Sequence, residues 1–208
     1  MSTVQEHLAI GPASHGMRMT LEQFDAPGDW DELYVYELVN GVLIVNPPPS
    51  EAERGPNELL GRMLWTYHER HPERSTFNYT LSEHTVNTPN NRRRADRVVW
   101  TGLDRMPNVR RDLPTIVIEF VSPDRRDHER DYVEKRSEYG SIGIREYWII
   151  DRFRRQMTVV RWDEDDCQEM TMSETDVYTT PLLPGFELPL ASLLAEADML
   201  MRDTSNEE

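Results

Sequence analysis

The 208-residue chain is predicted to adopt an α/β (α+β) fold, with a mixed, largely antiparallel central sheet flanked by helices. Residues 34–45 alternate between apolar and polar and contain Asn40-Gly41, the strongest short hairpin signal. Residues 116–121 (IVIEFV) are apolar except for one Glu, which is typical of a strand covered on both faces. Helical patterns at 51–71 and 130–140 lie between the strands, so helices and sheet should pack together.

Local signals place the ends of several elements. Thr20 is expected to cap a short helix, with Gln23 as its capping-box partner. Ser50 is expected to cap the 51–71 helix. Ser122-Pro123 should end the apolar strand, because a residue before proline avoids the helical conformation. Further strands are expected at 76–88, 94–101, 146–150, 157–162 and 167–173, with a closing helix at 190–201.

The totals limit the class of protein. We expect a flexible N-terminal segment over 1–18, one domain over 19–200 and an acidic tail over 201–208. No apolar run approaches the ~20 residues that span a bilayer, and no secretory pattern opens the chain. The single cysteine, Cys167, excludes an intramolecular disulfide and favours the cytoplasm. The net charge of -15 argues against a general nucleic-acid coat, but it leaves a metal-binding enzyme open.

The basic residues are unusual. Lysine and arginine together number 23, yet Lys135 is the only lysine. Lysine carries a compact, mobile ammonium, whereas arginine is a planar fork that keeps its proton. Lys135 is therefore suggestive of a site that a guanidinium cannot serve, although chance alone could leave one lysine anywhere.

Two carboxylates on neighbouring strands and this lysine form a candidate site. Asp96 begins one predicted strand, and Glu119 lies inside the next, where an unpartnered carboxylate would cost several kcal/mol. Asp131, Lys135 and Tyr139 are four residues apart and share one face of the following helix. Paired carboxylates suit Mg²⁺, and a nearby ammonium suits phosphodiester hydrolysis. A purely structural ion pair between Glu119 and Lys135 or an arginine is the alternative.

The run Arg92-Arg93-Arg94 precedes Asp96 and has two possible interpretations, a phosphate contact and a solvated loop. The three guanidinium groups could contact a phosphate backbone. A solvated loop is the interpretation that we prefer for this run.

Several short segments together resemble the Uma2 family, also called DUF820, of restriction-endonuclease-like proteins with the PD-(D/E)XK nuclease fold. The resemblance covers about residues 19–195. The matching segments are Met19–Phe24, Tyr36–Gly41, Ala95-Asp96, Ile118–Pro123, Asp131–Asp151 and Pro181–Phe186.

The resemblance implies a restriction-endonuclease-like sheet and cleavage of DNA that depends on Mg²⁺, with Mn²⁺ as an alternative. The acidic residues of the family fall on Asp96 and Glu119. The usual lysine position of the wider fold holds Val121 here. In this family a lysine on the next helix is thought to replace it, and Lys135 matches that position.

The resemblance also suggests supporting residues. Glu37 matches an early Glu that would assist catalysis or ligate metal. Asp131 and Tyr139 match helix positions that would orient the lysine. This chain departs from the family where Ala95 replaces a common Pro, and where residues 50–54 lack a His that many members carry.

The prediction is a cytoplasmic, Mg²⁺-dependent endodeoxyribonuclease with DNA as substrate and no membrane partner. A catalytically silent nuclease-fold module that binds a protein or nucleic-acid partner is the alternative function. An acidic, halophilic version of an ordinary nuclease would also explain the charge, and a homodimer is left open.

Overall fold

The computed structural model describes residues 10–26, 28–70, 76–122, 130–163 and 166–205. Its contacts group the chain into two compact units. Unit 1 consists of Met1–Pro49 and Thr85–Arg94, and unit 2 consists of Ser50–His84 and Ala95–Glu208. The domain limits expected from the sequence stay a prediction. Within the described residues, no helix is both long and apolar enough to cross a membrane.

Unit 1 contains the N-terminal helix and hairpin. Helix α1 (Leu21–Asp25) begins after Thr20, whose hydroxyl accepts from the Gln23 N–H at 3.2 Å while the Gln23 side chain accepts from the Thr20 N–H at 2.8 Å. The predicted capping box is therefore confirmed. Strands β1 (Val35–Val39) and β2 (Val42–Asn46) form the predicted hairpin, and unit 1 also has the short helix η1 (Pro12–Ser14).

Asn40 and Gly41 both have positive φ, at 50° and 73°. Two successive residues in this conformation make the tight turn whose twist matches that of a hairpin. The Asn40 N–H also donates to the Asn91 side chain at 2.7 Å.

Unit 2 is built on a mixed sheet, as predicted. β4 pairs antiparallel with β5, β5 pairs parallel with β6, and β6, β7 and β8 follow as antiparallel neighbours. β3 pairs with β4. The bounds are β3 Phe77–Asn87, β4 Arg92–Thr101, β5 Ile116–Phe120, β6 Glu146–Asp151, β7 Gln156–Trp162 and β8 Cys167–Ser173; the ends of β3 and β4 nearest their connection belong to unit 1.

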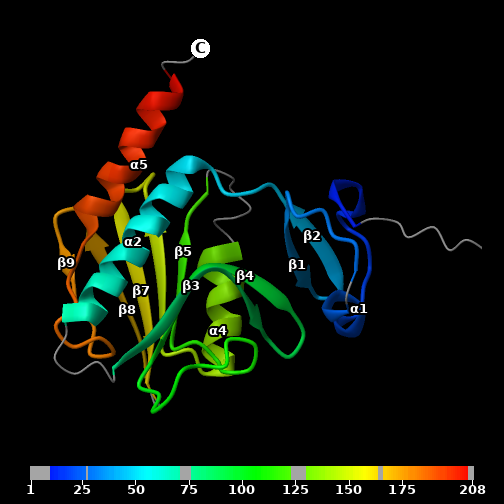
Figure 1. Ribbon diagram of the computed structural model, residues 1–208, viewed down its shortest axis with the longest axis horizontal. Coiled ribbons are helices and arrows are strands. Elements are labelled where there is room, and N and C mark those ends of the chain that lie inside the picture. The colour runs from blue at the N-terminus through cyan, green and yellow to red at the C-terminus, as the bar shows by residue number, and fades with distance from the viewer. Residues whose placement is uncertain (1–9, 27, 71–75, 123–129, 164–165, 206–208) are drawn as a thin grey trace, which may run out of the picture. The chain divides into compact units, whose positions relative to one another are not determined.

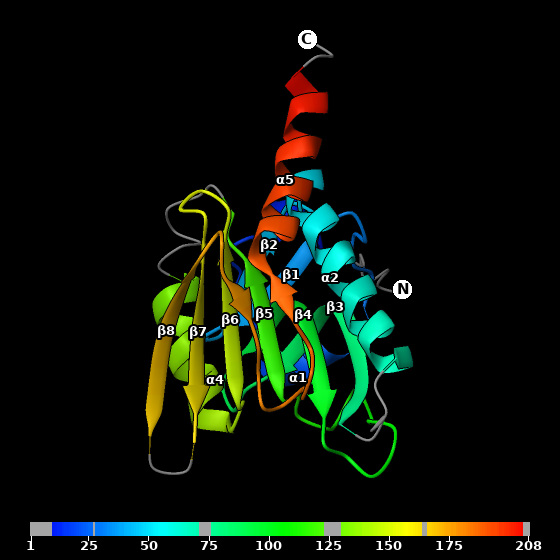
Figure 2. The ribbon, with the colours of Figure 1, turned by 90° about the vertical axis from the view of Figure 1, so that its left-hand side faces the viewer.

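Helices cover both faces of this sheet (Figures 1 and 2). Helices α2 (Glu51–Arg70) and α5 (Leu190–Ser205) lie on one face. The π-helical turn η2 (Arg130–Lys135) and helix α4 (Arg136–Ile142) lie on the other. The main core forms beneath α2 and α5, and includes Leu60 and Leu64 of α2, Leu193 and Leu194 of α5, and Ile116, Ile118, Trp148, Ile150, Met157 and Val159 of the sheet.

A buried carboxylate ties the C-terminal segment to this core. Glu146 is fully buried and accepts hydrogen bonds from Trp148 Nε1 (2.9 Å), the Tyr178 hydroxyl (2.9 Å) and the Thr180 hydroxyl (2.7 Å). Arg161 Nε donates to it at 2.8 Å, which supplies the opposite charge. Burial and the neighbouring carboxylate raise the pKa of Tyr178, so its hydroxyl stays a donor. Tyr178 belongs to the small sheet of β9 (Val177–Tyr178) and β10 (Leu188–Pro189).

Candidate active site

Glu119 lies on the sheet face that α4 covers. Side chains alternate along a strand, so Ile118 and Phe120 enter the core beneath α2 and α5, and Glu119 projects to the other side. The side chain is only 4% exposed. A carboxylate at this depth needs a charged or hydrogen-bonding partner.

Lys135 provides that partner. Its Nζ lies 2.9 Å from Glu119 Oε1, and the Lys135 side chain is 1% exposed. Tyr139, one turn further along, donates its hydroxyl to the same oxygen at 3.3 Å. The only lysine of the chain is thus buried against the carboxylate that the sequence singled out.

The local backbone explains how Lys135 reaches the sheet. Residues Arg130–Lys135 form a π-helical turn, and regular α-helix starts at Arg136. A π-turn inserts one extra residue per turn and thereby changes the direction of the side chains that it carries, and such turns are frequent at functional sites. The change from π to α geometry falls at Lys135 itself.

Asp96 lies on the neighbouring strand and joins this group through the backbone. Arg97 pairs with Ile118 in the β4–β5 ladder, so one further step sets Asp96 opposite Glu119. Opposed residues of antiparallel strands project from the same face. Asp96 Oδ2 accepts from the Phe120 N–H at 2.6 Å, which fixes the carboxylate beside the residue that follows Glu119. Asp96 is half-buried, whereas Glu119 and Lys135 are buried.

Asn57 supports Asp96 from the other face of the sheet, and the sequence analysis missed it. Its Nδ2 donates to the Asp96 carbonyl at 2.8 Å, and its Oδ1 accepts from Arg97 Nε at 2.6 Å. Burial lowers the pKa of Arg97, while the Glu58 carboxylate opposes this shift. A signal existed: Asn57 occupies the same helical stripe as Leu60 and Leu64, where a polar side chain needs a partner.

Tyr132 connects the π-helical turn to the C-terminal end of β6. Its hydroxyl donates to Asp151 Oδ2 at 3.4 Å, and burial followed by the Asp151 charge raises the pKa of Tyr132. Asp151 Oδ1 accepts from the N–H groups of Phe153 and Arg154, both at 3.0 Å. Tyr132 lies three residues before Lys135 and holds the same turn.

Glu37, Asp131 and the Arg92–Arg94 run complete the set of residues that the sequence singled out. Glu37 lies in unit 1, where it is buried and accepts from the Arg94 N–H at 2.8 Å. The side chain of Asp131 lies outside the described residues. The interpretation of Arg92–Arg94 as a loop is wrong, because these residues begin β4, and Arg92 pairs with Asp25 at 2.6 Å.

The donor set of the site fits a hard divalent ion. Asp96 and Glu119 offer carboxylate oxygens on one sheet face, which Mg²⁺ favours. Among the described residues, no three His, Cys, Asp or Glu side chains gather to hold a metal. Mg²⁺ commonly keeps several waters beside one or two carboxylates, so two acids are a sufficient protein contribution.

The fold is that of a nuclease-like protein of known structure. The structure of a putative nuclease belonging to DUF820 from Anabaena variabilis ATCC 29413 matches with a TM-score of 0.65 at 15% sequence identity. The match covers 86% of this chain and 99% of that one. At this identity the likeness establishes the fold alone.

The family follows from the sequence itself. Residues 22–191 match the model of the Uma2 family, described as putative restriction endonuclease. The chain belongs to the Uma2 family. No curated protein matches it at a significant level.

Proposed function

We propose that the protein is a metal-dependent endonuclease that hydrolyses DNA phosphodiester bonds. The observation that carries the proposal is the sealed contact of 2.9 Å between Lys135 and Glu119. A buried ion pair is weak evidence for stability, since apolar residues of similar volume often serve as well. Membership of the chain in a family described as putative restriction endonuclease supports a catalytic role for this pair.

In this proposal Asp96 and Glu119 hold Mg²⁺, with Mn²⁺ as a substitute. The ion, when bound, would polarise the phosphodiester and lower the pKa of a bound water. DNA would approach from the side of Asp96 in this proposal, since Asp96 is half-buried whereas Glu119 and Lys135 are buried.

Lys135 has two tasks. Its ammonium orients the attacking water, and it places a positive charge where the phosphate gains negative charge in the transition state. Tyr139 restrains the Glu119 carboxylate, so that lysine and carboxylate keep a fixed relation. Glu37 and Asp131 remain candidates for supporting roles.

A plasmid-nicking assay tests the proposal. Purified protein is incubated with supercoiled, linear and single-stranded DNA, with and without Mg²⁺. Asp96→Ala, Glu119→Ala and Lys135→Ala should each abolish Mg²⁺-dependent nicking while circular dichroism still reports a folded chain. Arg136→Ala is the matched control, because Arg136 follows Lys135 but forms an exposed pair with Glu169. Full nicking by folded Lys135→Ala would contradict the proposed role.

A catalytically silent module that binds a partner is the second candidate. The net charge of -15 favours it, because a strongly acidic surface repels DNA. Calorimetric titration with Mg²⁺ or Mn²⁺ separates the two functions. Metal binding that disappears in Asp96→Asn and Glu119→Gln supports the nuclease. A separate series of nicking assays at rising salt concentration tests the third idea, since nicking that persists at high salt would identify the acidic charge as a halophilic adaptation. We propose the cytoplasm as the place of action, which the single, exposed Cys167 favours.

A further inference from the structure

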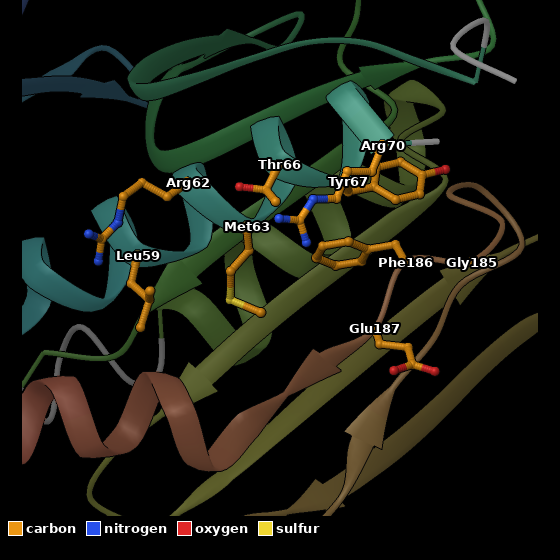
Figure 3. Close-up of a pocket in the computed structure, with 9 residues that line it drawn as sticks. All are labelled: Leu59, Arg62, Met63, Thr66, Tyr67, Arg70, Gly185, Phe186 and Glu187. Carbon is orange, nitrogen blue, oxygen red and sulfur yellow. The ribbon is translucent and has the colours of Figure 1, made fainter. Parts of the chain in front are cut away.

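Unit 2 has an open pocket on the sheet face opposite the candidate active site (Figure 3). It measures about 800 Å³ and lies between α2 and the segment 185–187. Leu59, Met63 and Tyr67 contribute apolar surface from α2. Methionine adapts its shape to different partners, so such a surface suits a docked side chain.

Two arginines lie at opposite ends of this pocket. Arg62 and Arg70 both line it, and among the described residues no carboxylate lies within ion-pair distance of either. Figure 3 draws Arg62 at the end of the pocket near Leu59, and Arg70 at the end near Phe186. Several other arginines of unit 2 do form ion pairs, among them Arg136, Arg155 and Arg161. With Glu187 included, the lining carries a net charge of +1, although the whole chain is strongly acidic.

The end of α5 has the complementary chemistry. Met199 and Met201 are 51% and 46% exposed, and Leu200 lies between them. Successive helical residues point about 100° apart, so Met199 and Met201 lie on either side of Leu200, which faces Gly55 of α2. The sequence that follows contains Arg202 against Asp203, Glu207 and Glu208, a net charge of -2.

Within the part of the chain that the structure describes, the end of α5 lies near the start of α2. Leu200 packs beside Gly55, at the start of α2. Arg62 and Arg70 lie seven and fifteen residues further along that helix, or about 10 Å and 22 Å at 1.5 Å per residue. Helix α5 continues to Ser205 and projects beyond the start of α2, away from Arg70 (Figures 1 and 2).

We infer that the pocket receives the end of α5 from a second copy of this chain, with apolar side chains against Leu59 and Met63 and the acidic tail against Arg62 and Arg70. Reciprocal exchange of the two ends closes a two-fold dimer, which is the commonest symmetric assembly. The mode is that of an amphipathic helix entering a groove. The inference does not depend on the nuclease proposal.

Complementary charge reversals test the dimer. The pocket variant is Arg62→Glu with Arg70→Glu, and the tail variant is Asp203→Arg with Glu207→Arg and Glu208→Arg. Light scattering after size exclusion should show a dimer for the original chain. The dissociation constant of the dimer should be about 100-fold higher for each variant alone, since like charges then face each other. Mixing the two variants should restore the dimer, because each pocket again meets a tail of opposite charge.

Controls exclude general effects of charge. Arg110→Glu with Arg111→Glu reverses two exposed arginines elsewhere in unit 2 and should leave the dimer intact. Met199→Ser with Met201→Ser probes the apolar contact without changing charge and should also dissociate it. A monomeric original chain at high concentration, a dimer that survives pocket reversal, or a mixture of folded variants that stays monomeric would each overturn the inference.

Discussion

The buried pair of Glu119 and Lys135 leads to a double-mutant cycle on stability. Lys135→Met removes the cation and Glu119→Gln removes the anion, and each leaves its partner buried at 4% exposure or less. Breaking a buried pair by removing one partner costs about 3–5 kcal/mol, because an uncompensated charge remains. For a chain of this length each kcal/mol lowers the melting temperature by roughly 2–4 °C, so each single change should lower it by roughly 6–20 °C.

The combined variant should recover most of this loss. With both charges absent, no ion remains to be desolvated, and the amide introduced by Glu119→Gln can still accept from the Tyr139 hydroxyl. Neutral replacement of a buried pair is often stabilising by about 1–4 kcal/mol. Urea unfolding followed by circular dichroism gives the free energies of unfolding. Losses that simply add, with coupling below about 0.5 kcal/mol, would refute the reasoning.

Three further outcomes follow from other contacts. Gly61→Ala should destabilise the protein by about 1–2 kcal/mol in thermal unfolding. The new Cβ would lie 2.8 Å from the Arg97 guanidinium, which is buried and bonded to Asn57, and displacing it outweighs the gain of about 1 kcal/mol that alanine has over glycine in a helix; exposed Thr66→Ala on the same helix is the control. The Arg105 guanidinium lowers the pKa of Asp112 from 3.8 to about 2, so this carboxylate stabilises the fold above about pH 4 and loses its effect as the pH falls toward 2. In melting curves across that range, Asp112→Asn should lose less stability on acidification than the original chain, and an unchanged slope would contradict this. Tyr139→Phe should cost about 0.5–1.5 kcal/mol and slow nicking without abolishing it; an unaltered nicking rate would rule out its positioning role.

Local signals were sufficient for most of the secondary structure. The Asn40-Gly41 turn and the Thr20 cap depend on neighbours in the chain, so the sequence determines them directly. The Arg92–Arg94 run shows the limit of this reasoning. Three adjacent charges favour a loop, but Arg92 pairs with Asp25, 67 residues away, and pairing across that distance cannot be read from local composition.

The candidate site was predictable in part. Lys135 stood out because it is the only lysine, and Glu119 because it interrupts an apolar strand. Helical spacing placed Tyr139 on the same face, and its hydrogen bond to Glu119 agrees with that expectation. The π-turn and the contact of Asn57 with the Asp96 carbonyl arise from tertiary packing, which no periodicity encodes.

The hydrogen bonds to buried Glu146 affect the order in which the chain can fold during its synthesis. Two of the four hydrogen-bond donors, Tyr178 and Thr180, come from the closing part of the chain. Until those residues leave the ribosome, Glu146 of β6 would lack two of its hydrogen-bond donors. Because β6 pairs along its length with the strand that carries Glu119, the packing of that strand also depends on these late residues. A chain that ends before Tyr178 should therefore lack a fully packed β5–β6 pair, even though both strands have already been synthesised.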